Sequence, residues 1–301
     1  MLSILIPVFN YRMEALVSEL SAQCTRLNLP FEIVLLDDGS TPQFKAANKA
    51  LALQFTGVRY LENTKNEGRS ASRNRLGVEA RGEWLWFLDC DGRANQNDTL
   101  VETFWQQKEE KTLLSGGRIY AAEPPADKSK QLHWQWGSKR ELLDSKKRMK
   151  DPVNNFLSNN FFVSRRLMQT VQFSTDLNGY GYEDTLFAAH CIENRFQIVH
   201  IENPVLHEGL ESTESFIAKI EESLHNMVRL DNMYKKHNKE IPLNSRLYRL
   251  YKKTRRIPKF VIVPFARISA SILKKRLQNG MLNLFWFDVY RLCYAICLPH
   301  K

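Results

Sequence analysis

The chain has 301 residues, 43% of them hydrophobic and 25% charged, and it carries a formal net charge of +10. This composition is that of a folded globular protein and excludes a fibrous or largely disordered one. The excess charge lies in the C-terminal part, where positions 246–301 contain 13 lysines and arginines and one acid, Asp288. We therefore expect a near-neutral body and a basic tail with an anionic partner.

The cysteines and the N-terminus bear on the compartment. Five cysteines, an odd number without Cys-x-x-Cys spacing, do not form a disulfide framework or a zinc site. The segment Met1–Ile4 continues directly into a strand pattern without a basic region or cleavage site, and no uncharged apolar stretch reaches the roughly 18 residues of a spanning helix. A cytoplasmic location is therefore expected.

Strands and helices are predicted to alternate over the first part of the chain. Apolar runs at 3–8, 32–36, 58–61 and 84–88 predict four strands, with helices predicted between the first two and at 70–80. This order is typical of an α/β fold with a mainly parallel sheet. Ligands of such sheets bind at the carboxyl ends of the strands, which is where the polar side chains cluster.

The second half of the chain is less regular. The segment 121–151 mixes Pro, Lys, Ser and two tryptophans and predicts a long loop or lid. Strands are predicted at 159–163 and 196–201, and helices at 185–194, from 212 to about 239, and at 282–298. The change of pattern near 211 predicts a boundary between a first domain, 1–211, and a helical basic region, 212–301.

Asp89-Cys90-Asp91 follows the fourth predicted strand and places two carboxylates one residue apart. Because such carboxylates repel each other, a hard cation such as Mg²⁺ or Mn²⁺, bridging them to a diphosphate, would account for the pair. The alternative is a simple turn after a strand, where Asp and Gly are common. The same alternative applies to Asp37-Asp38-Gly39-Ser40.

Taken in order, four segments resemble the nucleotide-binding half of family 2 glycosyltransferases. They are Pro7–Asn10, Asp37–Ser40, Asn66–Asn74 and Asp89–Asp91. The resemblance covers most of the first 210 residues or so and implies a GT-A, Rossmann-like fold, a mixed and mainly parallel sheet flanked by helices, with a C-terminal helical appendage. It implies a nucleotide-sugar-binding half at 1–100 and an acceptor-binding half at 101–211.

The resemblance also implies roles for single residues. The sugar nucleotide would be contacted by residues of the first strand end, the second and fourth strand ends and the helix between them: Pro7, Phe9, Asn10, Asp38, Arg73, Asp89 and Cys90. Asp91 would ligate a divalent cation, Mn²⁺ or Mg²⁺. Related enzymes place a further ligand where His207 stands, and its imidazole would suit Mn²⁺; loop packing is the alternative for this histidine.

The segment Gly179–Asp184 resembles the acceptor-side motif of the same family. The resemblance implies that Asp184 is the base that takes the proton of the acceptor hydroxyl and that Glu183 helps to bind the acceptor. The alternative for Asp184 is a helix N-cap. Acceptor contacts are predicted for Asn160, Tyr182 and Trp136, with packing as the alternative for the tryptophan.

The implied function is inverting transfer of a hexose or N-acetylhexosamine from a nucleoside-diphosphate sugar. Among these donors, a UDP-sugar is the first expectation. The acceptor would be a hydroxyl on a glycan or lipid-linked glycan, as in polysaccharide biosynthesis. One alternative is a catalytically inactive relative that binds a sugar nucleotide or a glycan. A nucleic-acid-binding protein would explain the basic tail but not the acidic motifs, so no nucleic acid is expected as a partner.

In the tail, basic clusters such as Lys252-Lys253 and Lys274-Lys275-Arg276 lie beside apolar and aromatic runs. This pattern predicts peripheral attachment to an anionic membrane surface, on the inner face of the plasma membrane, with the helix at 282–298 in the interface. The alternative is that these helices pack on the catalytic domain and that their charges are solvated.

Overall fold

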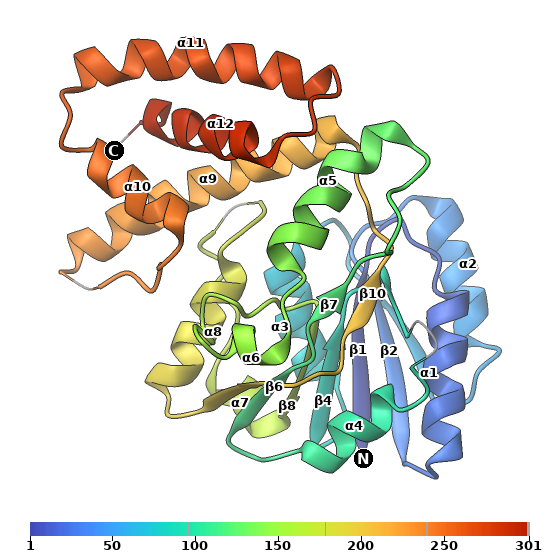
Figure 1. The fold of residues 1–301 in the computed structure, drawn as a ribbon. Helices are drawn as coiled ribbons and strands as arrows, with labels where there is room; N and C mark the ends of the chain where they lie inside the picture. The colour runs from blue at the N-terminus through green and yellow to red at the C-terminus, as the bar shows by residue number, and fades with distance from the viewer. Residues whose placement is uncertain (95–96, 178, 239, 300–301) are drawn as a thin grey trace. The chain divides into compact units, whose positions relative to one another are not determined.

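The computed structural model describes residues 1–94, 97–177, 179–238 and 240–299. The chain forms two compact units. The sheet unit comprises Met1–Tyr120, Leu142–Thr175 and Leu186–Gly209, and the helical unit comprises Ala121–Glu141, Asp176–Thr185 and Leu210–Lys301. Figure 1 shows the elements along the chain.

A seven-stranded sheet in the order β3-β2-β1-β4-β8-β6-β9 forms the centre of the sheet unit. Its strands are β1 (Leu2–Val8), β2 (Phe31–Asp37), β3 (Val58–Glu62), β4 (Trp84–Leu88), β6 (Thr112–Ser115), β8 (Asn160–Ser164) and β9 (Gln197–His200). All neighbouring pairs are parallel except the two that involve β8. The predicted α/β fold with a mainly parallel sheet is confirmed.

Helices cover both faces of this sheet (Figure 1). Apolar residues of α1 (Glu14–Arg26), α2 (Pro42–Ala52) and α4 (Leu100–Gln107) pack on one face. On the other face, the packing comes from α3 (Arg69–Glu79), α7 (Arg165–Thr170) and the part of α8 (Glu183–Glu193) from Leu186 onward. Because both faces are covered, β1, β2 and β4 are continuous apolar runs rather than alternating ones.

A small second sheet, in the order β5-β10-β7, lies in the same unit. It consists of β5 (Gly92–Arg93), β7 (Arg118–Ile119) and β10 (Val205–His207). The strands β10 and β5 are antiparallel, and His207 is paired with Gly92. This register brings a histidine from late in the chain next to the segment that follows β4.

The helical unit contains η1 (Lys128–Lys130), α5 (Gln131–Trp136), η2 (Gly137–Glu141), α9 (Thr213–Lys236), α10 (Arg246–Thr254), α11 (Lys259–Gln278) and α12 (Leu284–Cys297). Three of these helices begin at side-chain caps, Ser212 for α9, Ser245 for α10 and Asn283 for α12. None of the helices in the described part of the chain combines the length and the apolar character needed to cross a membrane.

One prediction about organisation is corrected by the structure. The segment 121–151 is not a loop with little regular structure, since it holds η1, α5, η2 and α6 (Ser145–Arg148). The compact units divide the chain at 209/210, close to the predicted boundary at 211, and also group 121–141 and 176–185 with the C-terminal helices. The cause is packing between distant segments: the ring of His133 stacks on Phe216 at 4.4 Å, and Trp136 meets Phe287 edge-on at 5.5 Å.

Candidate active site

Two loops are joined to each other at the carboxyl ends of β1 and β2. Asn10 adopts a left-handed conformation (φ 51°), its amide donates to the Ser40 hydroxyl at 2.8 Å, and its side-chain oxygen accepts from the amide of Thr41 at 2.8 Å. The Asp37 carboxylate accepts from the amides of Gly39 (3.1 Å) and Ser40 (2.8 Å). The alternative of a simple turn therefore fits Asp37, because its carboxylate accepts hydrogen bonds from the loop that follows it.

The buried carboxylate of Asp38 holds the loop that precedes α3. It accepts hydrogen bonds from the Asn63 amide group (2.7 Å) and from the backbone amides of Glu67 (2.8 Å) and Gly68 (2.9 Å). A carboxylate has about four acceptor sites. A contact to a nucleotide base would have to use the acceptor capacity that these three donors leave.

Phe9 lies directly after β1, in which Pro7 pairs with Leu36 of β2. The Phe9 side chain is 49% exposed. An accessible aromatic ring is a surface on which a nucleotide base can stack. The position of Phe9 is therefore compatible with its predicted role.

Arg73 and Asp89 form an ion pair at 2.7 Å between α3 and the end of β4. Arg73 is only 1% exposed, and its guanidinium lies over the ring of Phe173 at 5.4 Å. Within the described part of the chain, its Nε and Nη1 have no hydrogen-bond acceptor. Buried donors without a partner are costly, so an additional acceptor, such as a ligand oxygen, would complete this group.

Asp91 and His207 face each other next to this pair. The amide of Gly92 donates to the Asp89 carbonyl at 3.0 Å, which makes the acidic motif a tight turn. Because His207 is paired with Gly92 across β10 and β5, its Nδ1 lies 3.5 Å from Asp91 Oδ1. The turn and cation-site interpretations of the motif are thus compatible with each other.

The electrostatic environment favours the ionised form of Asp91. Burial alone would raise the pKa of this carboxyl group, but the hydrogen bond and electrostatic interaction with His207 and the positive charges of Arg118 and Arg69 hold its pKa well below the usual range. The ring of Tyr120 packs edge-on against His207 at 5.4 Å. The carboxylate is therefore kept charged, and the imidazole is held in place.

These two side chains fit a divalent cation as part of its ligand set. Among the described residues, no group of three or more His, Cys, Asp or Glu side chains is placed to hold a metal ion. Asp91 and His207 offer one carboxylate and one imidazole, a mixed oxygen and nitrogen set that suits Mn²⁺. The remaining ligands of such a cation would have to come from the substrate or from water.

Gly209 is a site residue that the sequence analysis missed. A Cβ atom added to it would lie 2.0 Å from Asp91 Oδ2, 2.7 Å from Asp91 Cγ and 2.9 Å from Asp91 Cβ. The neighbouring Glu208 amide donates to the Asp91 carbonyl at 2.9 Å. The backbone at 208–209 thus packs directly on Asp91, and only glycine leaves the carboxylate in its place.

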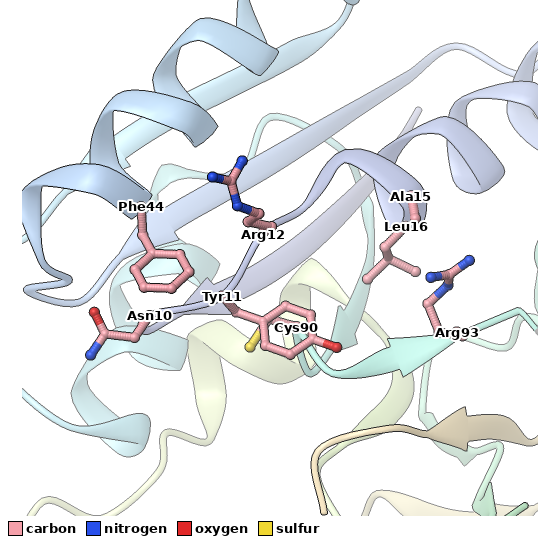
Figure 2. A pocket seen from close by; sticks show the side chains of 8 residues that line it. All are labelled: Asn10, Tyr11, Arg12, Ala15, Leu16, Phe44, Cys90 and Arg93. Carbon is pink, nitrogen blue, oxygen red and sulfur yellow. The ribbon is translucent and has the colours of Figure 1, made fainter.

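A pocket of about 370 Å³ lies beside the turn (Figure 2). Its lining includes Asn10, Tyr11, Arg12, Phe44, Cys90 and Arg93. Burial and the adjacent Asp91 and Asp89 raise the pKa of the Cys90 thiol, so this side chain stays neutral. Burial and Glu208 raise the pKa of Tyr11 to about 12. Neutral lining groups beside charged ones suit a polar ligand.

In the helical unit, α9 supports the Gly-Tyr-Gly-Tyr segment. Gly179, Gly181 and Tyr182 all have positive φ values of 73°, 102° and 70°. The Glu222 carboxylate accepts from the Tyr180 amide at 3.0 Å, and a Cβ at Gly181 would lie 2.5 Å from Ser223 Cβ. The two glycines are therefore required by the left-handed backbone and its close approach to α9.

The acidic pair that follows lies in the first turn of α8. The Glu183 carboxylate accepts from the Gly181 amide at 2.8 Å, and Asp184 is half-buried. Since α8 begins at Glu183, Asp184 is inside the helix and not at its N-cap, so the capping alternative is wrong in that form. The positive end of the helix dipole stabilises both carboxylates.

Asn160, predicted to contact the acceptor, lies inside the sheet unit. It is fully buried, it accepts from the Trp86 indole at 2.9 Å, and it donates to the carbonyls of Gly117 (3.0 Å) and Asn203 (2.9 Å). Both of its amide hydrogens are thus used within the protein. Its environment accounts for this residue as a link between segments and leaves no donor for a sugar.

Trp136 has a packed environment within the helical unit. The guanidinium of Arg291 lies 4.4 Å from the centre of its ring, Phe287 contacts it edge-on, and its indole donates to Glu141 at 3.2 Å. These contacts fit the alternative that Trp136 is a packing residue. Tyr182 keeps its strained backbone in the same unit, and burial raises the pKa of its hydroxyl.

Comparison with known proteins agrees with this picture. The sequence model described as "Glycosyl transferase family 2" matches residues 3–171. Glycosyltransferase GlyG of Streptococcus pneumoniae serotype 4 is 33% identical over 115 residues, 37% of this chain and 36% of that protein. An uncharacterized glycosyltransferase of Haemophilus influenzae is 36% identical over 93 residues, 30% of this chain and 29% of that protein. The matched region thus spans about a third of these relatives.

Solved structures share the fold. The mannosyltransferase PcManGT of Pyrobaculum calidifontis, in complex with GDP-Man and Mn²⁺, has a TM-score of 0.51 at 17% identity, covering 76% of this chain and 63% of that one. Residues 1–349 of S. aureus TarS have a TM-score of 0.51 at 14% identity, covering 98% and 89%. The predicted GT-A fold is confirmed. Because the family model spans more than half of the sequence, the chain belongs to glycosyl transferase family 2.

Proposed function

We propose that this chain is an inverting glycosyltransferase that moves a sugar from a nucleoside-diphosphate sugar to an acceptor hydroxyl. A UDP-sugar is the first candidate for the donor. The observation that carries the proposal is the pairing of Asp91 with His207 beside the buried Arg73–Asp89 ion pair. A cation ligand set and an incompletely satisfied cationic side chain at adjacent strand ends suit an anionic, hydroxyl-bearing ligand.

In this proposal the candidate site residues of the sheet unit each have a defined role. The ring of Phe9 stacks on the base, Asp38 accepts a hydrogen bond from it, and Asp89, oriented by Arg73, accepts one from the ribose. Asp91 and His207 hold a divalent cation, which when bound would neutralise charge on the departing diphosphate. Their fixed positions reduce the reorganisation that the reaction requires.

Asp184 is proposed to be the base. Its carboxylate takes the proton of the acceptor hydroxyl as that oxygen attacks the anomeric carbon, so that the bond to the diphosphate breaks on the opposite face and the configuration inverts. Glu183, anchored by the Gly181 amide at 2.8 Å, helps to bind the acceptor. A glycan or a lipid-linked glycan is the proposed acceptor class.

The test is a calorimetric screen of nucleoside diphosphates and their sugars with Mn²⁺, Mg²⁺ or EDTA. We expect one nucleotide to bind in a cation-dependent manner to the wild type, and Asp91→Asn to lose that dependence. Asp98→Asn, a change at an exposed acid, serves as the matched control and should bind as the wild type does. Unchanged cation-dependent binding by Asp91→Asn would remove the cation site from the proposal.

The Asp184→Asn variant separates binding from chemistry. It should bind the donor with the affinity of the wild type and lose transfer by about a hundredfold or more, the range typical of a positioned base. Retained transfer would refute the base assignment. Donor binding without transfer in the wild type, over a panel of glycan and lipid-linked acceptors, would favour the inactive sugar-nucleotide-binding relative.

A further inference from the structure

The helix α11 of the helical unit has apolar residues on two sides. Ala266, Leu273 and Leu277 are buried, and α11 packs against α12. Figure 1 shows α12 between α11 and α9 within this unit. A helix that is apolar on both sides normally has both sides covered.

The outward side of α11 is an apolar stripe. Val261, Phe265, Ile268 and Ile272 are 43%, 71%, 62% and 50% exposed, and their spacing of four, three and four residues places them on one face. Phe260, at the start of the helix, is 82% exposed. We call these five residues the α11 stripe. Contiguous exposed apolar surface of this kind marks an interaction site.

Positive charge surrounds the α11 stripe. Arg256, Lys259, Arg267, Lys275 and Arg276 are all exposed, and positions 246–287 contain no acid. The first carboxylate after them, Asp288, forms ion pairs with Arg140 (2.9 Å) and Arg291 (3.1 Å). Lys274 of α11 forms an ion pair with Glu221 (2.6 Å), and the other cations give the surroundings of the stripe a net positive charge.

We infer that the α11 stripe docks on an anionic lipid bilayer, with α11 lying in the plane of the interface. Aromatic and aliphatic side chains enter the acyl boundary, and the flanking cations contact the anionic headgroups. A second copy of the chain fits less well, because two such faces would bring their like charges together. Charge complementarity thus selects the bilayer.

This surface differs from the one expected from the sequence. The predicted interfacial helix, 282–298, corresponds to α12, in which Phe287, Tyr290 and Ala295 are fully buried, while Phe285 and Trp286 at its start are 63% and 45% exposed. The main interfacial role is therefore assigned to α11, because its exposed apolar stripe extends from Phe260 to Ile272. The inference rests on α11 alone and does not depend on the proposed transferase activity.

The test is co-sedimentation of the full chain with vesicles of 70:30 phosphatidylcholine and phosphatidylglycerol, without nucleotide. The triple variant Phe265→Ser, Ile268→Ser, Ile272→Ser should lower the partition coefficient by about tenfold or more through lost apolar burial. The triple variant Lys259→Gln, Arg267→Gln, Lys275→Gln should lower it by about a hundredfold, at about fivefold for each near-surface cation.

The matched control is Leu53→Ser, Val78→Ser, Ile192→Ser, which removes three exposed apolar side chains of the sheet unit. It should partition as the wild type does. Circular dichroism checks that every variant is folded. No binding by the wild type, or equal binding by the first triple variant, would overturn the inference. It would also be overturned by a dimer in light scattering that this variant abolishes, because the stripe would then bind a second copy.

Discussion

Gly209 is the position at which one added methyl group tests the cation site. Gly209→Ala would place Cβ at 2.0 Å from Asp91 Oδ2, whereas real contacts of this kind stay beyond 3.0 Å. Rotation of the Asp91 side chain would relieve the contact with Oδ2 only by displacing the carboxylate, and Asp91 Cβ would still be at 2.9 Å. The carboxylate must therefore move by about 1 Å, a displacement large enough to disturb a preorganised site.

The expected result is a cation affinity about 10 to 100 times weaker, the range seen when a group that orients a metal ligand is changed. Isothermal titration of Mn²⁺ in the presence of a saturating nucleoside diphosphate measures it. Gly77→Ala, a change inside α3, is the matched control, because its added Cβ would lie at an ordinary distance of 3.4 Å from Met168 Cε. Wild-type Mn²⁺ affinity in Gly209→Ala would refute the view that the backbone at 209 holds Asp91 in place.

Two further predictions concern stability. Asn160→Ala leaves the Trp86 indole and two carbonyls without their partner, so the free energy of unfolding in urea should fall by about 3 kcal/mol, at roughly 1 kcal/mol for each group; a loss below about 1 kcal/mol would contradict the structural role. Burial, with help from Arg148, lowers the pKa of His200 from 6.5 to about 4. Between these two pKa values the histidine is protonated in the unfolded chain but neutral in the folded one. The contribution of neutral His200 to the free energy of unfolding is therefore complete above pH 6.5 and is lost as the pH falls toward 4, by up to about 3 kcal/mol. His200→Gln should show a correspondingly flatter pH dependence of unfolding than the wild type, and identical curves would contradict the prediction.

The helical elements between 121 and 151 depend on packing against segments that are distant in the sequence. The mixed residue types and few apolar positions of 121–151 predict a loop. In the structure, His133 stacks on Phe216 and Trp136 packs with Phe287 and Arg291. Short helices such as α5 are stabilised by these tertiary contacts rather than by local propensity, which is why the pattern did not predict them.

The amino-acid sequence by itself determined the family, the mainly parallel sheet and the order of polar motifs at the strand ends, because these depend on local apolar runs and on short spacings. Only the tertiary structure decided which of these side chains meet. Asp91 faces His207 because β10 pairs with β5 in one register across more than about 100 residues of chain, and Gly209 is explained by the same pairing. Likewise, which apolar side chains of α11 and α12 are buried and which are exposed depends on how the two helices pack, and similar apolar patterns cannot distinguish this.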